Sequence, residues 1–167
     1  MTSVDRNKIL EHTEIQAKVE RIAHEIHENY FQEKKIILVG ILGRGYEFAT
    51  RLHKILKEIA DFDIELLEII LNKDEPLSND ITIDKNTTFK NKSVLLVDDV
   101  LNSGKTLAYA ASYLLNQAPK SLKTVILVNR KHIRYPVTAD FVGLSLATTM
   151  NEHIAVEFGK KDAVFLD

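Results

Sequence analysis

The sequence predicts an α/β fold in which a mostly parallel, twisted sheet is flanked by helices. Continuous apolar runs bounded by charge or glycine recur along the chain, as expected for strands that are buried on both faces. Segments with apolar residues at helical spacing alternate with these runs. Alternation of strand and helix is typical of a parallel sheet, and a length of 167 residues suggests one domain, 1–167.

The individual elements follow in order along the chain. Apolar residues at helical spacing predict helices over residues 14–30, 48–59 and 107–115. Buried runs predict strands over residues 36–40, 64–71, 94–97 and 124–128, and the remainder reads as short strands and loops. Residues 72–92 are polar, contain Pro76 and lack sustained periodicity, with one short hairpin expected around residues 81–83. Such a long segment in a compact domain is usually functional or disordered, and we expect a mobile flap without apolar anchors.

Composition excludes several classes of protein. There is no cysteine, so disulfides and thiolate metal sites are excluded, and the six histidines include no HExxH motif. The N-terminus has no apolar signal region, and the longest apolar run, Ile36–Leu42, is far short of a membrane span. A cytoplasmic protein is expected. The net charge of -2 argues against general coating of nucleic acid but permits a local basic face.

Two glycine-bearing loops occur where a predicted strand ends and a helix begins, at 42–45 and 102–106. In a parallel sheet such turns lie at the carboxyl edge, where ligands bind, so we expect both loops to share one crevice. The second loop ends in Gly-Lys-Thr, but residue 99 is Asp where a P-loop needs its first glycine. A P-loop kinase is therefore excluded, and Phe48 likewise breaks a dinucleotide fingerprint that begins at Gly43.

The second loop still suits a phosphate. Free N–H groups at a helix start, with hydroxyls from Ser103 and Thr106, favour a compact monophosphate. Asp98 and Asp99 precede this loop. Ionised carboxylates only accept hydrogen bonds, so they match a sugar diol or a divalent cation. The pattern predicts a ligand with a phosphate beside a ribose, in preference to carboxylates that merely cap a helix.

The stretch VLLVDDVLNSGKTL (94–107) resembles the 5-phosphoribosyl-1-pyrophosphate (PRPP) signature of the type I phosphoribosyltransferases. Most of the chain is similar to the bifunctional pyrimidine-operon attenuator/uracil phosphoribosyltransferase family, through residues 21–26, 37–52, 74–81 and 125–143. The resemblance implies an enzyme that joins a nucleobase, uracil first, to PRPP in pyrimidine salvage. It also implies Mg²⁺ as cofactor and a homodimer.

The resemblance further implies site residues. The catalytic residues would be Asp98, Asp99 and Arg44, and both aspartates would lie near the metal. The PRPP-binding residues would be Gly43, Arg44, Gly45, Asp98, Asp99, Asn102, Ser103, Gly104, Lys105 and Thr106. The base-binding residues would be Val100, Arg130, Phe141 and Val142, under a hood at 129–150.

Some positions depart from the family pattern. Asn72-Lys73 stands near the place of a flap arginine, the flap is shorter, and Asn129-Arg130 replaces an Asp-Arg pair. Asn102 replaces an acid of the purine-salvage relatives, and an amide cannot be a general base. The alternative function is an RNA-binding regulator that senses nucleotides, which the acidic balance disfavours. Its basic face would comprise Arg21, His24, Arg130, Lys131, His132 and Arg134.

Overall fold

The computed structural model describes residues 6–167 and has the predicted α/β architecture. The helices are α1 (His12–Tyr30), α2 (Arg44–Ile59) and α3 (Lys105–Leu115). The strands are β1 (Asn7–Leu10), β2 (Lys35–Ile41), β3 (Asp63–Ile70), β4 (Thr82–Ile83), β5 (Ser93–Leu101), β6 (Ser121–Asn129), β7 (Phe141–Ser145), β8 (Ile154–Glu157) and β9 (Ala163–Leu166). Within the described residues, no helix is long and apolar enough to cross a membrane.

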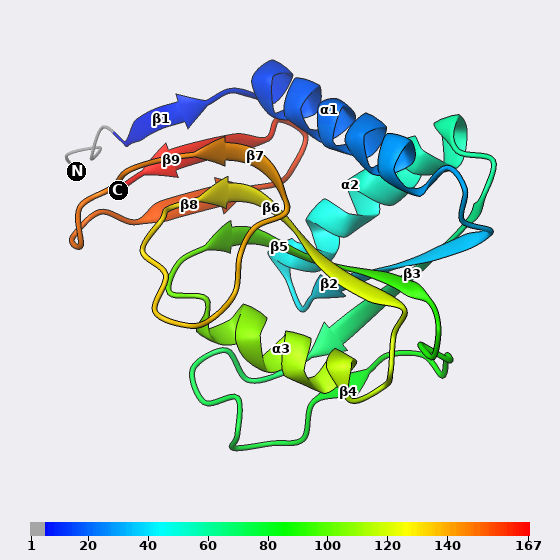
Figure 1. Cartoon of the computed structure of the whole chain (residues 1–167). Coiled ribbons are helices and arrows are strands. Elements are labelled where there is room, and N and C mark those ends of the chain that lie inside the picture. Colours follow the sequence, from blue (N-terminus) through cyan, green and yellow to red (C-terminus); the bar gives the residue numbers. More distant parts are fainter. Residues whose placement is uncertain (1–5) are drawn as a thin grey trace.

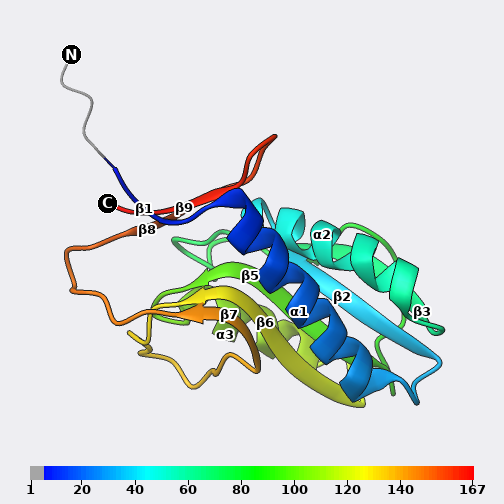
Figure 2. The ribbon, with the colours of Figure 1, turned by 90° about the horizontal axis from the view of Figure 1, so that it is seen from above.

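The central layer is a six-stranded sheet with the order β4-β3-β2-β5-β6-β7. Every neighbouring pair is parallel except β3 and β4. The strands at its centre, β2 and β5, are buried almost throughout, because helices cover both faces. Figures 1 and 2 show α1 and α2 on one face of the sheet and α3 on the other.

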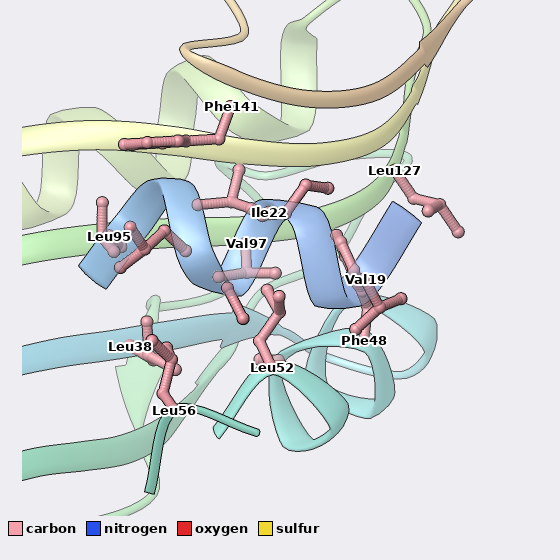
Figure 3. Close-up of a cluster of buried hydrophobic side chains, with 14 of the residues drawn as sticks. Val19, Ile22, Leu38, Phe48, Leu52, Leu56, Leu95, Val97, Leu127 and Phe141 are labelled. Atoms are coloured by element: carbon pink, nitrogen blue, oxygen red, sulfur yellow. The ribbon is translucent and has the colours of Figure 1, made fainter. Parts of the chain in front are cut away.

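Alternating side chains of the central strands form two separate cores. On the α1 and α2 face, Leu38 and Val97 pack with Ile22 and Phe48 (Figure 3). On the opposite face, Val39 lies with the apolar side chains of α3. This division follows from the period of two in a strand, which sends successive side chains to opposite faces. The two cores hold β2 and β5 rigidly, and with them the loops at the carboxyl ends of these strands.

A second, three-stranded antiparallel sheet has the order β1-β9-β8 and joins the two ends of the chain. Asn7 pairs with Leu166, and Val156 and Val164 bury their side chains in the same core as α1 and α2. The predicted hood at 129–150 forms no separate layer of this kind. Its residues 141–145 are β7, an edge strand of the main sheet.

The predicted flap has two parts. Residues 72–80 contain no helix or strand, in agreement with the sequence reading. The expectation that the whole segment lacks apolar anchors is wrong for its second half. Phe89 is only 5% exposed, and Ile81 and Ile83 pack against the α3-side core. The segment contains no hairpin of its own around residues 81–83: the two-residue strand β4 pairs with β3, which lies outside the segment.

Candidate active site

A cavity of about 420 Å³ lies at the carboxyl ends of β2 and β5. Both glycine-bearing loops line it, as expected for a parallel sheet. Its wall therefore combines two helix starts with the end of a buried strand. The lining residues are Leu42, Gly43, Arg44, Lys73, Asp98, Asp99, Val100, Leu101, Asn102, Ser103, Gly104, Lys105, Thr106, Leu107, Ile126 and Ile154.

Two carboxylates form the floor of this cavity. Asp98 and Asp99 end the buried run of β5 and are only 7% and 8% exposed. The backbone N–H of Asp99 donates to Asp98 Oδ1 at 2.9 Å. Burial raises the pKa of Asp98 well above its ordinary value, the negative charge of Asp99 raises this pKa further, and the charge of Lys73 partly opposes the shift. The pair is thus a concentrated, poorly solvated set of acceptors for hydroxyl groups or a cation.

The loop after β5 is shaped to receive an anion. Gly104 has φ of +87°, a conformation that side chains disfavour, and a Cβ there would stand 2.5 Å from Val137 Cγ2. The first intrahelical bond of α3 runs from Ala108 N–H to Gly104 O at 2.8 Å. The N–H groups of Thr106 and Leu107 precede that bond and so have no partner within the helix, and the Lys105 N–H donates to Ser103 Oγ at 3.3 Å. This is the geometry of a phosphate cradle.

The loop after β2 places a second helix start beside the carboxylates. Gly43 has φ of +89° and caps α2, which begins with Arg44. Gly45 lies against β5 so closely that a Cβ there would stand 2.8 Å from Asp98 Oδ1 and 2.9 Å from Val97 O. Only glycine permits this approach of α2 to the strand. The two carboxylates of the site therefore lie between the starts of α2 and α3, and Arg44, whose side chain carries a guanidinium group, lines the same cavity.

The structure adds residues that the sequence reading did not assign to the site. Lys73, from the flap, lines the cavity near Asp98, and Lys105 Nζ donates to Asp74 O at 3.2 Å. These contacts bring residues 73–74 to the phosphate loop. Ile154 of β8 also lines the cavity, so the small sheet forms part of its wall. Ile154 was not assigned to the site from the sequence, because the small sheet pairs the two ends of the chain and no neighbouring residues indicate that pairing.

Three of the predicted base-binding residues do not line the cavity, whereas Val100 does. Phe141 is 5% exposed and packs in the core, with its ring 6.4 Å from that of Tyr30. Val142 uses its carbonyl oxygen to accept from Arg21 at 3.0 Å. Arg130 is buried and turned to neighbouring backbone and side-chain oxygens.

The carboxylates fit a metal that arrives with a ligand. No group of three or more metal-binding side chains gathers anywhere within residues 6–167. Two adjacent carboxylates alone are a partial coordination shell, which suits Mg²⁺ because this ion is usually bound by one or two carboxylates and substrate phosphates. A divalent cation would also offset the repulsion between Asp98 and Asp99.

Comparisons with known proteins indicate one protein family. The model of the phosphoribosyl transferase domain family matches residues 5–162. Two relatives are each named "Bifunctional protein PyrR". The one from Haemophilus ducreyi is 33% identical over 166 residues, covering 93% of this chain and 92% of the relative. The one from Alkaliphilus metalliredigens is 37% identical over 172 residues, covering 95% and 93%.

Solved structures share the fold. The hypoxanthine phosphoribosyltransferase of Trypanosoma cruzi superposes with a TM-score of 0.75 at 21% identity, covering 89% of this chain and 84% of that one. A hypoxanthine-guanine phosphoribosyltransferase of Bacillus anthracis gives 0.70 at 21% identity, covering 86% and 84%. At these identities the likeness concerns the arrangement of strands and helices.

Proposed function

The chain belongs to the phosphoribosyltransferase family and is an enzyme of that class, and we propose that it transfers the 5-phosphoribosyl group of PRPP to uracil. The products are uridine 5′-monophosphate and pyrophosphate. One observation carries this proposal. Two buried carboxylates lie between two helix starts in a single cavity, and the three parts match the ribose, the 5′-phosphate and the pyrophosphate of PRPP.

Asp98 and Asp99 accept hydrogen bonds from the ribose hydroxyls in this proposal. Their low exposure strengthens the interaction, because water competes poorly there. Hydrogen bonds to a charged group are worth roughly 1.5–3 kcal/mol each. The 5′-phosphate lies on residues 102–106, where the N–H groups of Thr106 and Leu107 and the positive end of the helix dipole favour an anion.

The loop 43–45 holds the pyrophosphate. When the bond from C1′ breaks, positive charge develops on the sugar and negative charge on the leaving group. Arg44, the N–H groups of α2 and the Lys73 ammonium then stabilise the departing anion. Mg²⁺, held by Asp98 and Asp99 on one side, would supply further neutralisation of the pyrophosphate when bound. The flap residues 73–80 close over the reacting centre and exclude water.

Uracil is proposed from the sequence resemblance, with support from the relatives named as bifunctional proteins. The solved structures named as hypoxanthine enzymes share the fold at low sequence identity, so they do not identify the base that this chain accepts. The identity of the base depends on the side chains of this cavity. Val100 and Ile154 give the base an apolar contact surface. A homodimer is proposed on the same resemblance, and light scattering of the purified chain would measure it.

Regulation by RNA binding is the second candidate, and two observations weigh against a strong basic face. Arg130 is only 7% exposed. Arg21 is bonded to Glu25 and to the carbonyl oxygens of Val142 and Gly143. Both side chains are thereby occupied within the protein. Specific RNA binding would show a steep fall in affinity with salt and a dependence on sequence.

The test is conversion of a panel of bases. Uracil, cytosine, hypoxanthine, guanine, adenine and orotate are incubated with the enzyme, PRPP and Mg²⁺, and released pyrophosphate and nucleotide are measured. We expect uracil to give the highest kcat/KM. Preferential turnover of a purine would refute the assignment of uracil while leaving the family intact.

A further inference from the structure

The carboxylates of Asp98 and Asp99 have no direct counter-ion. Both side chains are buried, and like charges in such a place repel each other strongly. Within residues 6–167, no lysine, arginine or histidine nitrogen lies within 4.0 Å of either carboxylate. The cations that line the same cavity are Arg44, Lys73 and Lys105. A balancing charge therefore has to act on the pair from a longer distance.

Lys73 is the cation that acts on this pair. Burial raises the pKa of Asp98 most, the charge of Asp99 raises it further, and the charge of Lys73 lowers it. Lys105 is directed elsewhere, because its Nζ donates to Asp74 O at 3.2 Å. Lys73 is exposed, lines the cavity, and lies within 4.0 Å of no carboxylate of the described residues. It is thus a counter-ion that no direct bond holds in place, and its ammonium group can move.

The backbone around Lys73 is organised by the residue before it. Asn72 Oδ1 accepts hydrogen bonds from the N–H groups of Asp74 at 3.0 Å and of Glu75 at 3.1 Å, which forms a tight turn around residue 73. The contact between Lys105 and Asp74 ties this turn to the start of α3, and Figure 1 shows the segment between β3 and β4 passing beside that helix. These bonds bring Lys73 to the cavity in a stretch without helix or strand. Asn72 is therefore a positioning residue for Lys73.

An ammonium group in this place opposes a metal ion that arrives alone. Asp98 and Asp99 are the carboxylates that fit Mg²⁺, and a cation beside them repels a divalent ion. The same charge also opposes a proton on Asp98. A divalent ion carries twice the charge of the proton that it displaces, so the net effect of Lys73 is to weaken metal binding. The pyrophosphate group of PRPP reverses this balance, because its negative charges attract both the metal ion and the ammonium group.

We propose that Lys73 is the internal counter-ion of Asp98 and Asp99 in the ligand-free protein, and that it keeps a free divalent cation out of the cavity until PRPP binds. The ammonium group then turns from the carboxylates to the pyrophosphate, and the cation enters with the ligand. Lys73 thereby sets the order in which metal and substrate bind. The exclusion of the metal concerns the free protein alone, whereas the movement to pyrophosphate rests on the proposed function and deepens it.

Binding of Mn²⁺ to the ligand-free protein tests the exclusion of the metal. Mn²⁺ replaces Mg²⁺ as the probe because its free concentration can be read by electron paramagnetic resonance. Lys73→Met should bind Mn²⁺ about 10-fold more tightly than the parent, as for removal of one nearby unit charge. Lys73→Arg keeps the charge and should match the parent. Lys90→Met is the matched control, because it removes the same charge from an exposed lysine of the same segment that does not line the cavity.

Two further variants show where the gained Mn²⁺ binds and what places Lys73. Asn72→Ala leaves every charge in place but removes the turn, so it should raise the affinity for Mn²⁺ by a smaller factor than Lys73→Met does. The double variant Lys73→Met/Asp99→Asn lacks one of the two carboxylates and should lose the gain. Melting curves show that each variant is folded before its affinity is compared with that of the parent.

Turnover at saturating Mg²⁺ tests the movement to pyrophosphate. KM for PRPP should rise in Lys73→Met and stay unchanged in Lys90→Met, and an unchanged KM in both would overturn this step. Equal Mn²⁺ affinity in the parent and Lys73→Met, or an equal gain in Lys90→Met, would overturn the role of Lys73 as counter-ion. A parent protein that turns over no PRPP would contradict the proposed function, and the Mn²⁺ measurement would still decide the counter-ion role by itself.

Discussion

Gly45→Ala tests whether α2 really packs against the carboxylate strand. Gly45 is the second residue of α2, where alanine would improve helix propensity by about 1 kcal/mol. The added Cβ would stand 2.8 Å from Asp98 Oδ1, 2.9 Å from Val97 O and 3.2 Å from Asp98 Cα. Overpacking of this kind costs about 1–3 kcal/mol, and the cost here should be about 2–3 kcal/mol, because backbone atoms of a central strand cannot move aside cheaply. We expect a net loss of about 1–2 kcal/mol.

Thermal unfolding measures this loss. At about 2–4 °C per kcal/mol for a chain of this size, Tm should fall by roughly 2–8 °C. Gly159→Ala is the matched control, because its Cβ would meet nothing within 4 Å. KM for PRPP should rise in Gly45→Ala, since the clash displaces either Asp98 or the helix start. An unchanged or higher Tm in Gly45→Ala would refute the close packing of α2 on β5.

Three further predictions concern stability and mobility. Asp98→Asn should unfold at a higher temperature than the parent at neutral pH. Burial and the charge of Asp99 raise the pKa of Asp98 in the folded protein. The parent therefore loses stability as the pH rises above about 4, the ordinary pKa of an aspartate in an unfolded chain. The advantage of the variant should vanish in acid, where Asp98 is protonated in both the folded and the unfolded parent. Asp162→Asn should lower Tm in a melting experiment at neutral pH, because this 2%-exposed carboxylate accepts from Arg51, Gln16 and Gly159. Backbone amide hydrogen exchange should be fast at residues 73–80 in the free protein and should become slower when Mg-PRPP is added. An exchange rate that does not change with Mg-PRPP would contradict the role of this segment as a lid.

The main sheet could be predicted from the sequence because its signals are local. The run at 94–97 is apolar at every position, and the structure buries it in the centre of the sheet. Helical spacing identified α1, α2 and α3 to within a few residues at their ends. The shared cavity also followed from a general property of parallel sheets, which brings the turns after β2 and β5 to one edge.

The small sheet could not be predicted in the same way. β1 and β9 are four residues each, and Asn7 pairs with Leu166 across the length of the chain. Short strands carry little periodicity, and nothing nearby in the sequence records such a remote partner. Ile154, which reaches the cavity from this sheet, was missed for that reason.

Arg130 shows a second limit of sequence reading. The family resemblance implies that this arginine contacts the base. Whether such an arginine faces the ligand, the solvent or internal carbonyl oxygens depends on the turn 148–152, which is irregular. Similarly, Lys73 enters the cavity because of how the flap folds back toward Lys105.

Calorimetric titration of Mg-PRPP tests the role of the two carboxylates most directly. Parent, Asp98→Asn and Asp99→Asn are compared at neutral pH, with melting curves to show that each variant is folded. Loss of charge-assisted hydrogen bonds of roughly 1.5–3 kcal/mol should raise Kd at least about 10-fold in each variant. Unchanged affinity in both folded variants would show that Asp98 and Asp99 do not hold the ribose, and the proposed arrangement of PRPP in the cavity would be wrong.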